Sequence, residues 1–116
     1  MARNTVVAGA SAEAEATRLL RAHGYQIVER NFRCRAGELD LIARDRGVLV
    51  FVEVRSRADA DHGHAAEMVH AHKQRQVARV AEHYLAMRDP EYDEVRFDVV
   101  AITGGEAELI QDAWRP

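Results

Sequence analysis

The sequence has little cysteine, proline or lysine and few aromatic residues, and these shortages exclude several classes of protein. A single cysteine, Cys34, excludes a framework of internal disulfide bonds. No run of about 18 apolar residues is present, so no segment is predicted to span a membrane. The N-terminal residues also lack the long apolar region of a secretory signal peptide. Together these absences predict a cytoplasmic protein.

The 116 residues, of which 47% are hydrophobic, suffice for one domain with one core, and we expect residues 1–116 to form it. The formal net charge of −3 argues mildly against nucleic acid as a partner, but the charge is unevenly distributed. Residues 1–57 carry ten arginines against seven acidic residues, whereas residues 88–116 carry three basic residues against eight acidic ones. The basic first half could form a phosphate-binding face, and an ordinary solvated surface is the alternative.

Hydrophobic periodicity predicts the order helix, three strands, helix, two strands. Ser11 is expected to cap a first helix over residues 11–23. A long amphipathic helix is expected over residues 65–87, ending before Pro90. The predicted strands cover residues 25–32, 37–44, 48–55, 95–102 and 107–111. This order predicts an α/β fold in which helices pack on a mixed sheet.

The second and third predicted strands carry acidic residues that need an explanation. Side chains two apart in a strand share a face, which predicts that Leu39 and Leu41 lie on one face. Glu38 and Asp40 are then expected on the other face. Glu53 comes late in a run so apolar that it predicts a central strand buried on both faces. A carboxylate in such a place needs a partner, and a metal ion would be one.

Two charged residues on the predicted helices are candidates for the same site. Glu13 lies at the edge of the apolar stripe of the first helix, which favours it mildly over Glu15 as an inward carboxylate. An ordinary acidic residue near a helix N-terminus is an equally good explanation of Glu13. Lys73, the only lysine, falls within the apolar stripe of the second helix and is expected to face the sheet. A lysine whose ammonium group reaches solvent from the edge of the core is the alternative.

Four histidines raise the competing hypothesis of a zinc site. His70 and His72 are two residues apart on a predicted helix and point about 200° apart, so they cannot chelate one ion together. His62 and His64 lie in a polar loop around a glycine and could do so in principle. We expect exposed histidines rather than a zinc site. Cys34 has no partner residues at the spacing of a catalytic nucleophile.

A family resemblance extends over most of the chain. It is carried by motifs that fall in a fixed order: Gly9, Ala12-Glu13, Ala16, Leu19, Gly24-Tyr25, Asn31-Phe32-Arg33, Gly37-Glu38-Leu39-Asp40-Leu41-Ile42, Phe51-Val52-Glu53-Val54-Arg55-Ser56-Arg57, Lys73 and Arg96-Phe97-Asp98-Val99-Val100. With these motifs the chain resembles the YraN-like family of uncharacterised bacterial proteins. That family is predicted to adopt the PD-(D/E)XK nuclease fold and to be related to archaeal Holliday junction resolvases. The resemblance implies a restriction-endonuclease-like three-layer α/β fold.

The resemblance also implies roles for individual residues. Asp40 and Glu53 would bind Mg²⁺ or Mn²⁺, together with the backbone carbonyl of Val54. Glu13 would be the helix-borne carboxylate that resolvase-like members add to this set. Glu38 would support the metal ligands without binding the metal itself.

The sequence departs from the family's motif at position 55. The family usually has lysine there, and this chain has Arg55, which stays protonated and cannot act as a general base. Three alternatives remain open: Arg55 is purely electrostatic, Lys73 reaches in as a substitute, or catalysis is weakened.

The implied function is that of a magnesium-dependent endonuclease, a hydrolase that cuts phosphodiester bonds in nucleic acid. DNA in repair or recombination is the expected substrate, although RNA, branched or linear targets and a homodimer all remain compatible with the sequence. The alternative is a non-catalytic module that binds nucleic acid or protein and has kept the nuclease fold.

Overall fold

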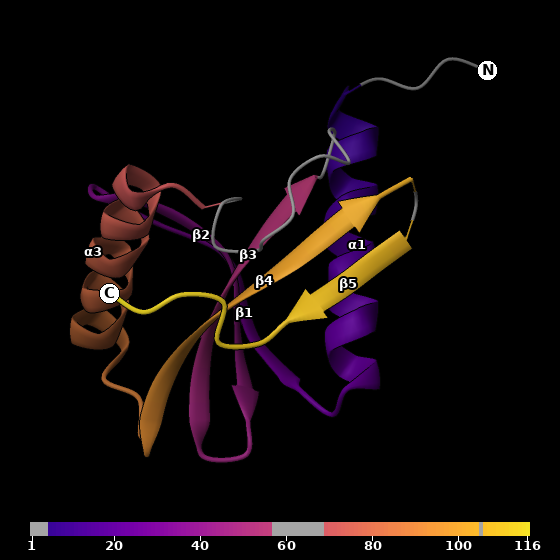
Figure 1. Ribbon diagram of the computed structural model, residues 1–116. Helices are drawn as coiled ribbons and strands as arrows, with labels where there is room; N and C mark the ends of the chain where they lie inside the picture. Colours follow the sequence, from indigo (N-terminus) through magenta and orange to yellow (C-terminus); the bar gives the residue numbers. More distant parts are fainter. Residues whose placement is uncertain (1–4, 57–68, 105) are drawn as a thin grey trace.

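The computed structural model describes residues 5–56, 69–104 and 106–116, with the backbone alone for residues 5–11 (Figure 1). Two helices and five strands follow one another in the predicted order, which confirms the α/β class. The elements are α1 (Thr5–Ala22), β1 (Gln26–Cys34), β2 (Gly37–Asp45), β3 (Val48–Ser56), α3 (Ala71–Arg88), β4 (Glu94–Thr103) and β5 (Glu106–Ile110).

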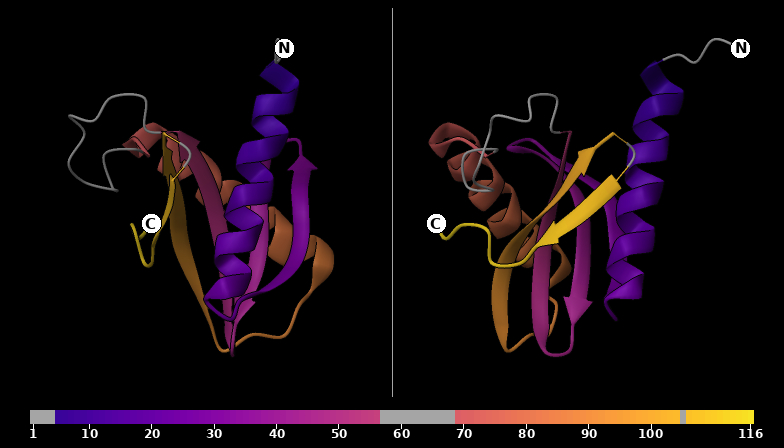
Figure 2. Two further views of the ribbon diagram at one scale, coloured as in Figure 1. Left: turned by 90° about the vertical axis from the view of Figure 1, so that its right-hand side faces the viewer. Right: turned by 45° about the vertical axis from the view of Figure 1, so that its right-hand side comes forward.

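The strands form one mixed sheet in the order β1-β2-β3-β4-β5, with α1 and α3 on opposite faces (Figure 2). Neighbouring strands are antiparallel except β3 and β4, which run parallel. A parallel pair needs a crossover connection, and α3 lies within the segment that makes it. The result is a helix-sheet-helix arrangement of three layers, consistent with a nuclease-like fold. Among the described residues, no helix is long and apolar enough to cross a membrane.

Each face of the sheet has its own hydrophobic core, and β3 contributes to both. Leu49 and Phe51 pack in the core on the α3 side, whereas Val50 and Val52 pack in the core on the α1 side. All four side chains are almost completely buried. The prediction that residues 48–55 form a central strand buried on both faces therefore agrees with the structure.

The prediction that Leu39 and Leu41 share a face is wrong. Leu39 belongs to the core on the α3 side and Leu41 to the core on the α1 side. The cause is an interruption in the pairing of β1 with β2 between the Arg30–Leu41 and Phe32–Leu39 pairs. Asn31, at the interruption, has a left-handed backbone with φ of 53°. Regular alternation along β2 therefore stops at the residue between the two leucines, Asp40.

Both predicted helix starts also differ from the structure. The first helix begins at Thr5, so Ser11 lies inside it and is not its cap. The alanines before Ser11 are good helix formers, which allows the helix to extend toward the N-terminus. The second helix begins at Ala71 after an extended His70, and the earlier part of the expected helix, residues 65–68, lies outside the described residues. Its end agrees with the prediction, because Asp89 adopts a left-handed C-cap before Pro90.

A buried polar network ties the strands together on the α1 side of the sheet. Asp98 on β4 is completely buried, and its carboxylate accepts hydrogen bonds from Tyr25 Oη at 2.7 Å and from Arg96 Nε at 2.9 Å. Arg96 also pairs with Asp45 at 3.1 Å, and Gln111 donates to Tyr25 Oη at 2.8 Å. Burial and the hydrogen bond to Asp98 raise the pKa of Tyr25 to about 12. The network stabilises the fold by pairing every charge that it buries.

Replacing Arg96 by Met tests this network. We expect the free energy of unfolding, measured by urea denaturation, to fall by about 3–5 kcal/mol, because Asp98 would be left buried without its cation. The matched control is Arg18→Met, which removes an exposed arginine that pairs with Glu15 on the same helix. Equal losses in the two variants would contradict a structural role of the network.

Candidate active site

The buried end of β3 places one carboxylate in the interior. The Glu53 side chain is only 5% exposed and extends on the α3 side of the sheet, toward Lys73. One of its oxygens, Oε2, is buried and has no hydrogen-bond partner. Among the described residues only one other buried side-chain atom, Trp114 Nε1, lacks a partner. Buried polar groups normally find partners, so an unpaired carboxylate oxygen marks a place where one is missing.

Asp40 lies beside Glu53 because the pairing of β2 with β3 stops there. The ladder ends at the pair Leu41–Val52, and the next residue of each strand is one of the two acids. Asp40 Oδ2 accepts a hydrogen bond from the Val54 backbone N–H at 2.8 Å, and the Asp40 backbone in turn hydrogen-bonds the Glu53 carboxylate. Side chains therefore replace the missing backbone pairs and hold the two acids together.

Lys73 approaches this pair from α3. Its Nζ lies 3.8 Å from Glu53 Oε1, and the side chain is 30% exposed. The predicted inward position of Lys73 is thus observed. One cation faces the acids from the helix above them, so attraction offsets part of the cost of burying their charges.

Burial perturbs the titration of both acids. Desolvation and the nearby charge of Asp40 raise the pKa of Glu53 to about 7, while the charges of Lys73 and Arg55 act in the opposite direction. Desolvation also raises the pKa of Asp40, against the hydrogen bond from Val54. Near neutral pH the pair can therefore hold a proton that a bound cation would displace.

Glu13 reaches the same region from α1. Its carboxylate accepts a hydrogen bond from Asn31 Nδ2 at 3.2 Å, and its charge raises the pKa of Asp40. Glu15 pairs with Arg18 on the helix surface, as the helical spacing predicts. In the described parts of the chain, however, no three His, Cys, Asp or Glu side chains converge closely enough to hold one ion. A metal-binding role of Glu13 therefore stays a prediction.

Glu38 lies at the edge of the site. Its exposed carboxylate pairs with Arg33 Nε at 3.0 Å, and its charge raises the pKa of Asp40. An open pocket of about 450 Å³ connects this edge with Lys73. The pocket is lined by Arg33, Cys34, Gly37, Glu38, Lys73 and Gln76. This position suits a group that supports the acids.

The charge of Arg55 acts on the buried acid. Arg55 is half-buried, and its guanidinium lowers the pKa of Glu53. A permanently charged group in this place provides electrostatic stabilisation without taking up a proton.

The zinc hypothesis receives no support from the described histidines. His70 and His72 are exposed at the start of α3, and the described residues contain no metal-holding group of which they are members. His62, His64 and Arg57 lie outside the described residues. Cys34 is half-buried in the wall of the open pocket.

Two residues of the site were not identified from the sequence. Asn31 supplies the backbone irregularity at Asp40 and also holds Glu13. Gln76 on α3 donates to the Ala36 carbonyl at 3.4 Å and packs against Gly37. An asparagine inside a strand was the available signal for the first, because asparagine tolerates left-handed backbone. No local signal marks Gln76, since its partner is distant in sequence.

Comparison with known proteins agrees with the resemblance seen in the motifs. The model of the uncharacterised protein family UPF0102 matches residues 12–102. A UPF0102 protein of Lachnoclostridium phytofermentans is 44% identical over 112 residues, covering 96% of this chain and 95% of the relative. A UPF0102 protein of Symbiobacterium thermophilum is 47% identical over 119 residues, covering 98% of each chain. The chain therefore belongs to the UPF0102 family, and the predicted membership of the YraN-like group of uncharacterised proteins is confirmed.

Proposed function

We propose that the protein is a metal-dependent endonuclease that hydrolyses phosphodiester bonds in nucleic acid, with DNA as the expected substrate. The observation that carries this proposal is the buried, unpaired oxygen of Glu53 beside the Asp40 carboxylate. Two desolvated acids with one facing cation are costly for a small domain to maintain. A cation that binds between them would offset that cost.

The acids suit Mg²⁺ or Mn²⁺ better than a metal that needs a complete protein cage. Mg²⁺ is commonly held by one or two carboxylates and keeps several water ligands. Asp40 and Glu53 would supply the carboxylates, the Val54 carbonyl a third oxygen, and Glu13 a further one from α1. When bound, such an ion supplies a more acidic water and stabilises negative charge on phosphate.

The cationic side chains account for binding and orientation of the substrate. Lys73, which is partly exposed and close to Glu53, can neutralise a phosphate oxygen from the α3 side. Arg55 adds a permanent charge behind the same acid. Arg33 also lines the pocket that leads to Lys73, and a phosphate group that enters there would compete with Glu38 for it. These contacts favour nucleic acid over a neutral substrate.

The second candidate is a binding module that has kept the fold without the chemistry. Two observations favour it: arginine replaces lysine at position 55, and no three acidic or histidine side chains of the described segments gather around one point. Such a module does not require a metal, so metal binding separates the two candidates.

Metal binding is expected to depend on pH through Glu53. The folded pKa of about 7 exceeds the ordinary value of 4.5, so between these values the folded state binds the proton more tightly than the unfolded chain. The free energy of unfolding, measured with urea in EDTA, should therefore fall from pH 5 to pH 8. Glu53→Gln should remove most of this decrease and exceed the wild type in stability at pH 8.

Mn²⁺ should raise the wild-type Tm more at pH 8 than at pH 5. A rise that persists in Glu53→Gln would place the metal elsewhere.

Nuclease activity is tested with labelled DNA duplexes, branched DNA and RNA in the presence of Mg²⁺ or Mn²⁺. We expect slow cutting that Asp40→Asn and Glu53→Gln each abolish, since each removes a charge that a metal needs, while the near-UV circular dichroism stays native. Glu15→Gln is the matched control, because Glu15 is a carboxylate on the surface of α1 that pairs with Arg18. Equal cutting by all four proteins would indicate a contaminating nuclease and contradict the proposal.

Two cases can be separated by their rates: either position 55 limits the chemistry, or Lys73 has taken over its role. If position 55 limits the chemistry, Arg55→Lys restores the family's motif and raises the rate, and Arg55→Ala lowers it by roughly 10²-fold or more. If Lys73 has taken over, Arg55→Lys leaves the rate unchanged. In that case Lys73→Met lowers the rate by roughly the 10²-fold given above for Arg55→Ala, and Lys73→Arg retains part of the wild-type rate. Single-turnover kinetics separate these effects on chemistry from effects on binding. An unchanged rate in Lys73→Met would exclude Lys73 from the mechanism.

A further inference from the structure

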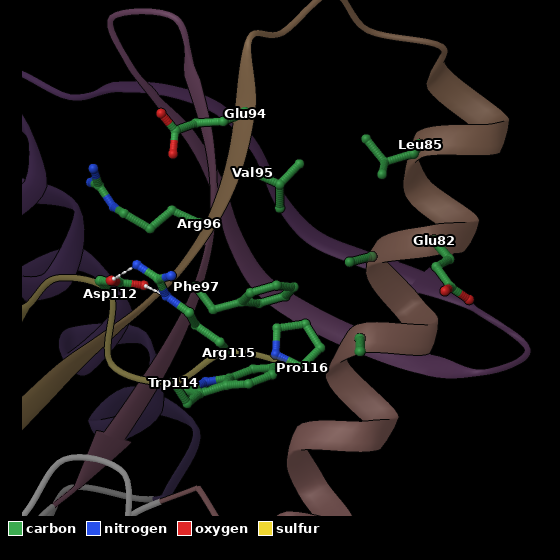
Figure 3. A pocket seen from close by; sticks show the side chains of 12 residues that line it. Glu82, Leu85, Glu94, Val95, Arg96, Phe97, Asp112, Trp114, Arg115 and Pro116 are labelled. Atoms are coloured by element: carbon green, nitrogen blue, oxygen red, sulfur yellow. Dashed lines mark hydrogen bonds and ion pairs between the residues drawn. The ribbon is translucent and has the colours of Figure 1, made fainter.

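A second concave site lies on the other flank of α3 (Figure 3). It is a groove of about 420 Å³ between the C-terminal half of α3, the first residues of β4 and the chain after β5. Its apolar lining consists of Ala78, Ala81, Leu85, Val95, Phe97, Trp114 and Pro116. None of the residues assigned to the candidate active site lines this groove. It therefore needs an explanation of its own.

Trp114 in this groove has an unmet hydrogen-bonding requirement. Its ring stacks on Phe97 with 4.3 Å between centroids, and the residue is 94% buried. The indole Nε1 is buried and has no hydrogen-bond acceptor among the described residues. Leaving a buried donor unpaired costs about 1–3 kcal/mol. Because Nε1 is out of contact with solvent, an occupant of the groove cannot reach it without a shift of the chain end.

The groove also borders an unpaired sheet edge. β4 pairs with β3 from Glu94 onward, whereas β5 covers its other side only from Val99 to Thr103. The Phe97 carbonyl accepts a bond from Ala113 N–H at 2.8 Å. Before Phe97, no described residue pairs with this side of β4. An extended chain could add to this free edge and hydrogen-bond with the backbone of β4.

The charge of the groove selects the class of occupant. Arg96 and Arg115 line it, but each is already paired, with Asp98 and Asp112 respectively. Glu82 and Glu94 also line it, and Glu94 acts on Arg115, whose pKa is raised by Asp112 and by Glu94. The lining therefore carries three acidic residues against two arginines, one of which is paired with the buried Asp98, so its net charge is negative. It repels a phosphate backbone and attracts basic side chains.

We propose that this groove binds an extended, basic peptide segment of a partner protein. The peptide backbone adds to the free edge of β4, and one apolar side chain packs against Phe97 and Trp114. Lysine or arginine side chains of the peptide lie near Glu82 and Glu94. The proposal is independent of nuclease activity, because the groove shares no residue with the candidate active site.

The single tryptophan makes the proposal testable in the whole 116-residue chain. A display library of random seven-residue peptides is selected on the wild type and counter-selected on the double variant Glu82→Arg/Glu94→Arg. We expect enriched sequences with one large apolar residue flanked by lysine or arginine. A synthetic copy of an enriched peptide should shift the fluorescence of Trp114 in a saturable manner. Its Kd should rise about tenfold or more in the double variant, because attraction becomes repulsion.

The matched control is Glu106→Arg, which reverses an exposed charge on β5 outside the groove and should change the Kd less than about twofold. The proposal is overturned if no peptide is enriched or if the enriched peptides lack basic residues. It is also overturned if the double variant and the control bind equally well. A fluorescence shift with oligothymidylate and none with peptides would assign the groove to single-stranded nucleic acid instead.

Discussion

The interrupted pairing between β2 and β3 is the feature on which the candidate site depends. Beyond Leu41 and Val52 the two strands are no longer joined through backbone carbonyls. The Asp40 carboxylate instead accepts a hydrogen bond from the Val54 backbone N–H. A carboxylate thus takes over a bond that holds the sheet together. The same bond fixes the position of Asp40 beside Glu53. The local fold and the placement of the two acids consequently depend on the same hydrogen bond.

The arrangement of charges divides the molecule into two regions of different electrostatic character. On the side that contains Lys73, buried acids are faced by cations from α3 and β3, and the neighbouring pocket carries Arg33. On the other flank of α3 the cations are already paired, and acidic residues outnumber them. The helix therefore separates the surface proposed to bind phosphate from the one proposed to bind a basic peptide. The excess of arginine before residue 57 and of acids after residue 88 has this spatial counterpart.

Much of this arrangement follows from periodicity alone. The order of elements, the doubly buried β3 and the inward Lys73 come from apolar spacings that a core enforces along the whole element. The faces of Leu39 and Leu41 could not be predicted, because a local irregularity at Asn31 overrides strict alternation. The start of α1 was placed too late, since a serine can lie within a helix when its neighbours favour one. The pairing of Asp98 with Tyr25 joins residues 73 positions apart, and no local pattern reports such a contact.

The turn between β1 and β2 leaves space for a polar side chain of α3. Gly37 has φ of 139°, and a Cβ atom there would lie 2.8 Å from Gln76 Nε2 and 3.3 Å from a methyl group of Val80. A larger residue would adopt a strained backbone and push aside the end of the Gln76 side chain, which donates a hydrogen bond to the Ala36 carbonyl. The absence of a side chain at Gly37 thus preserves a polar contact between the turn and α3, one helical turn after Lys73. A substitution at Gly37 would loosen the wall of the pocket while leaving both acids and Lys73 unchanged.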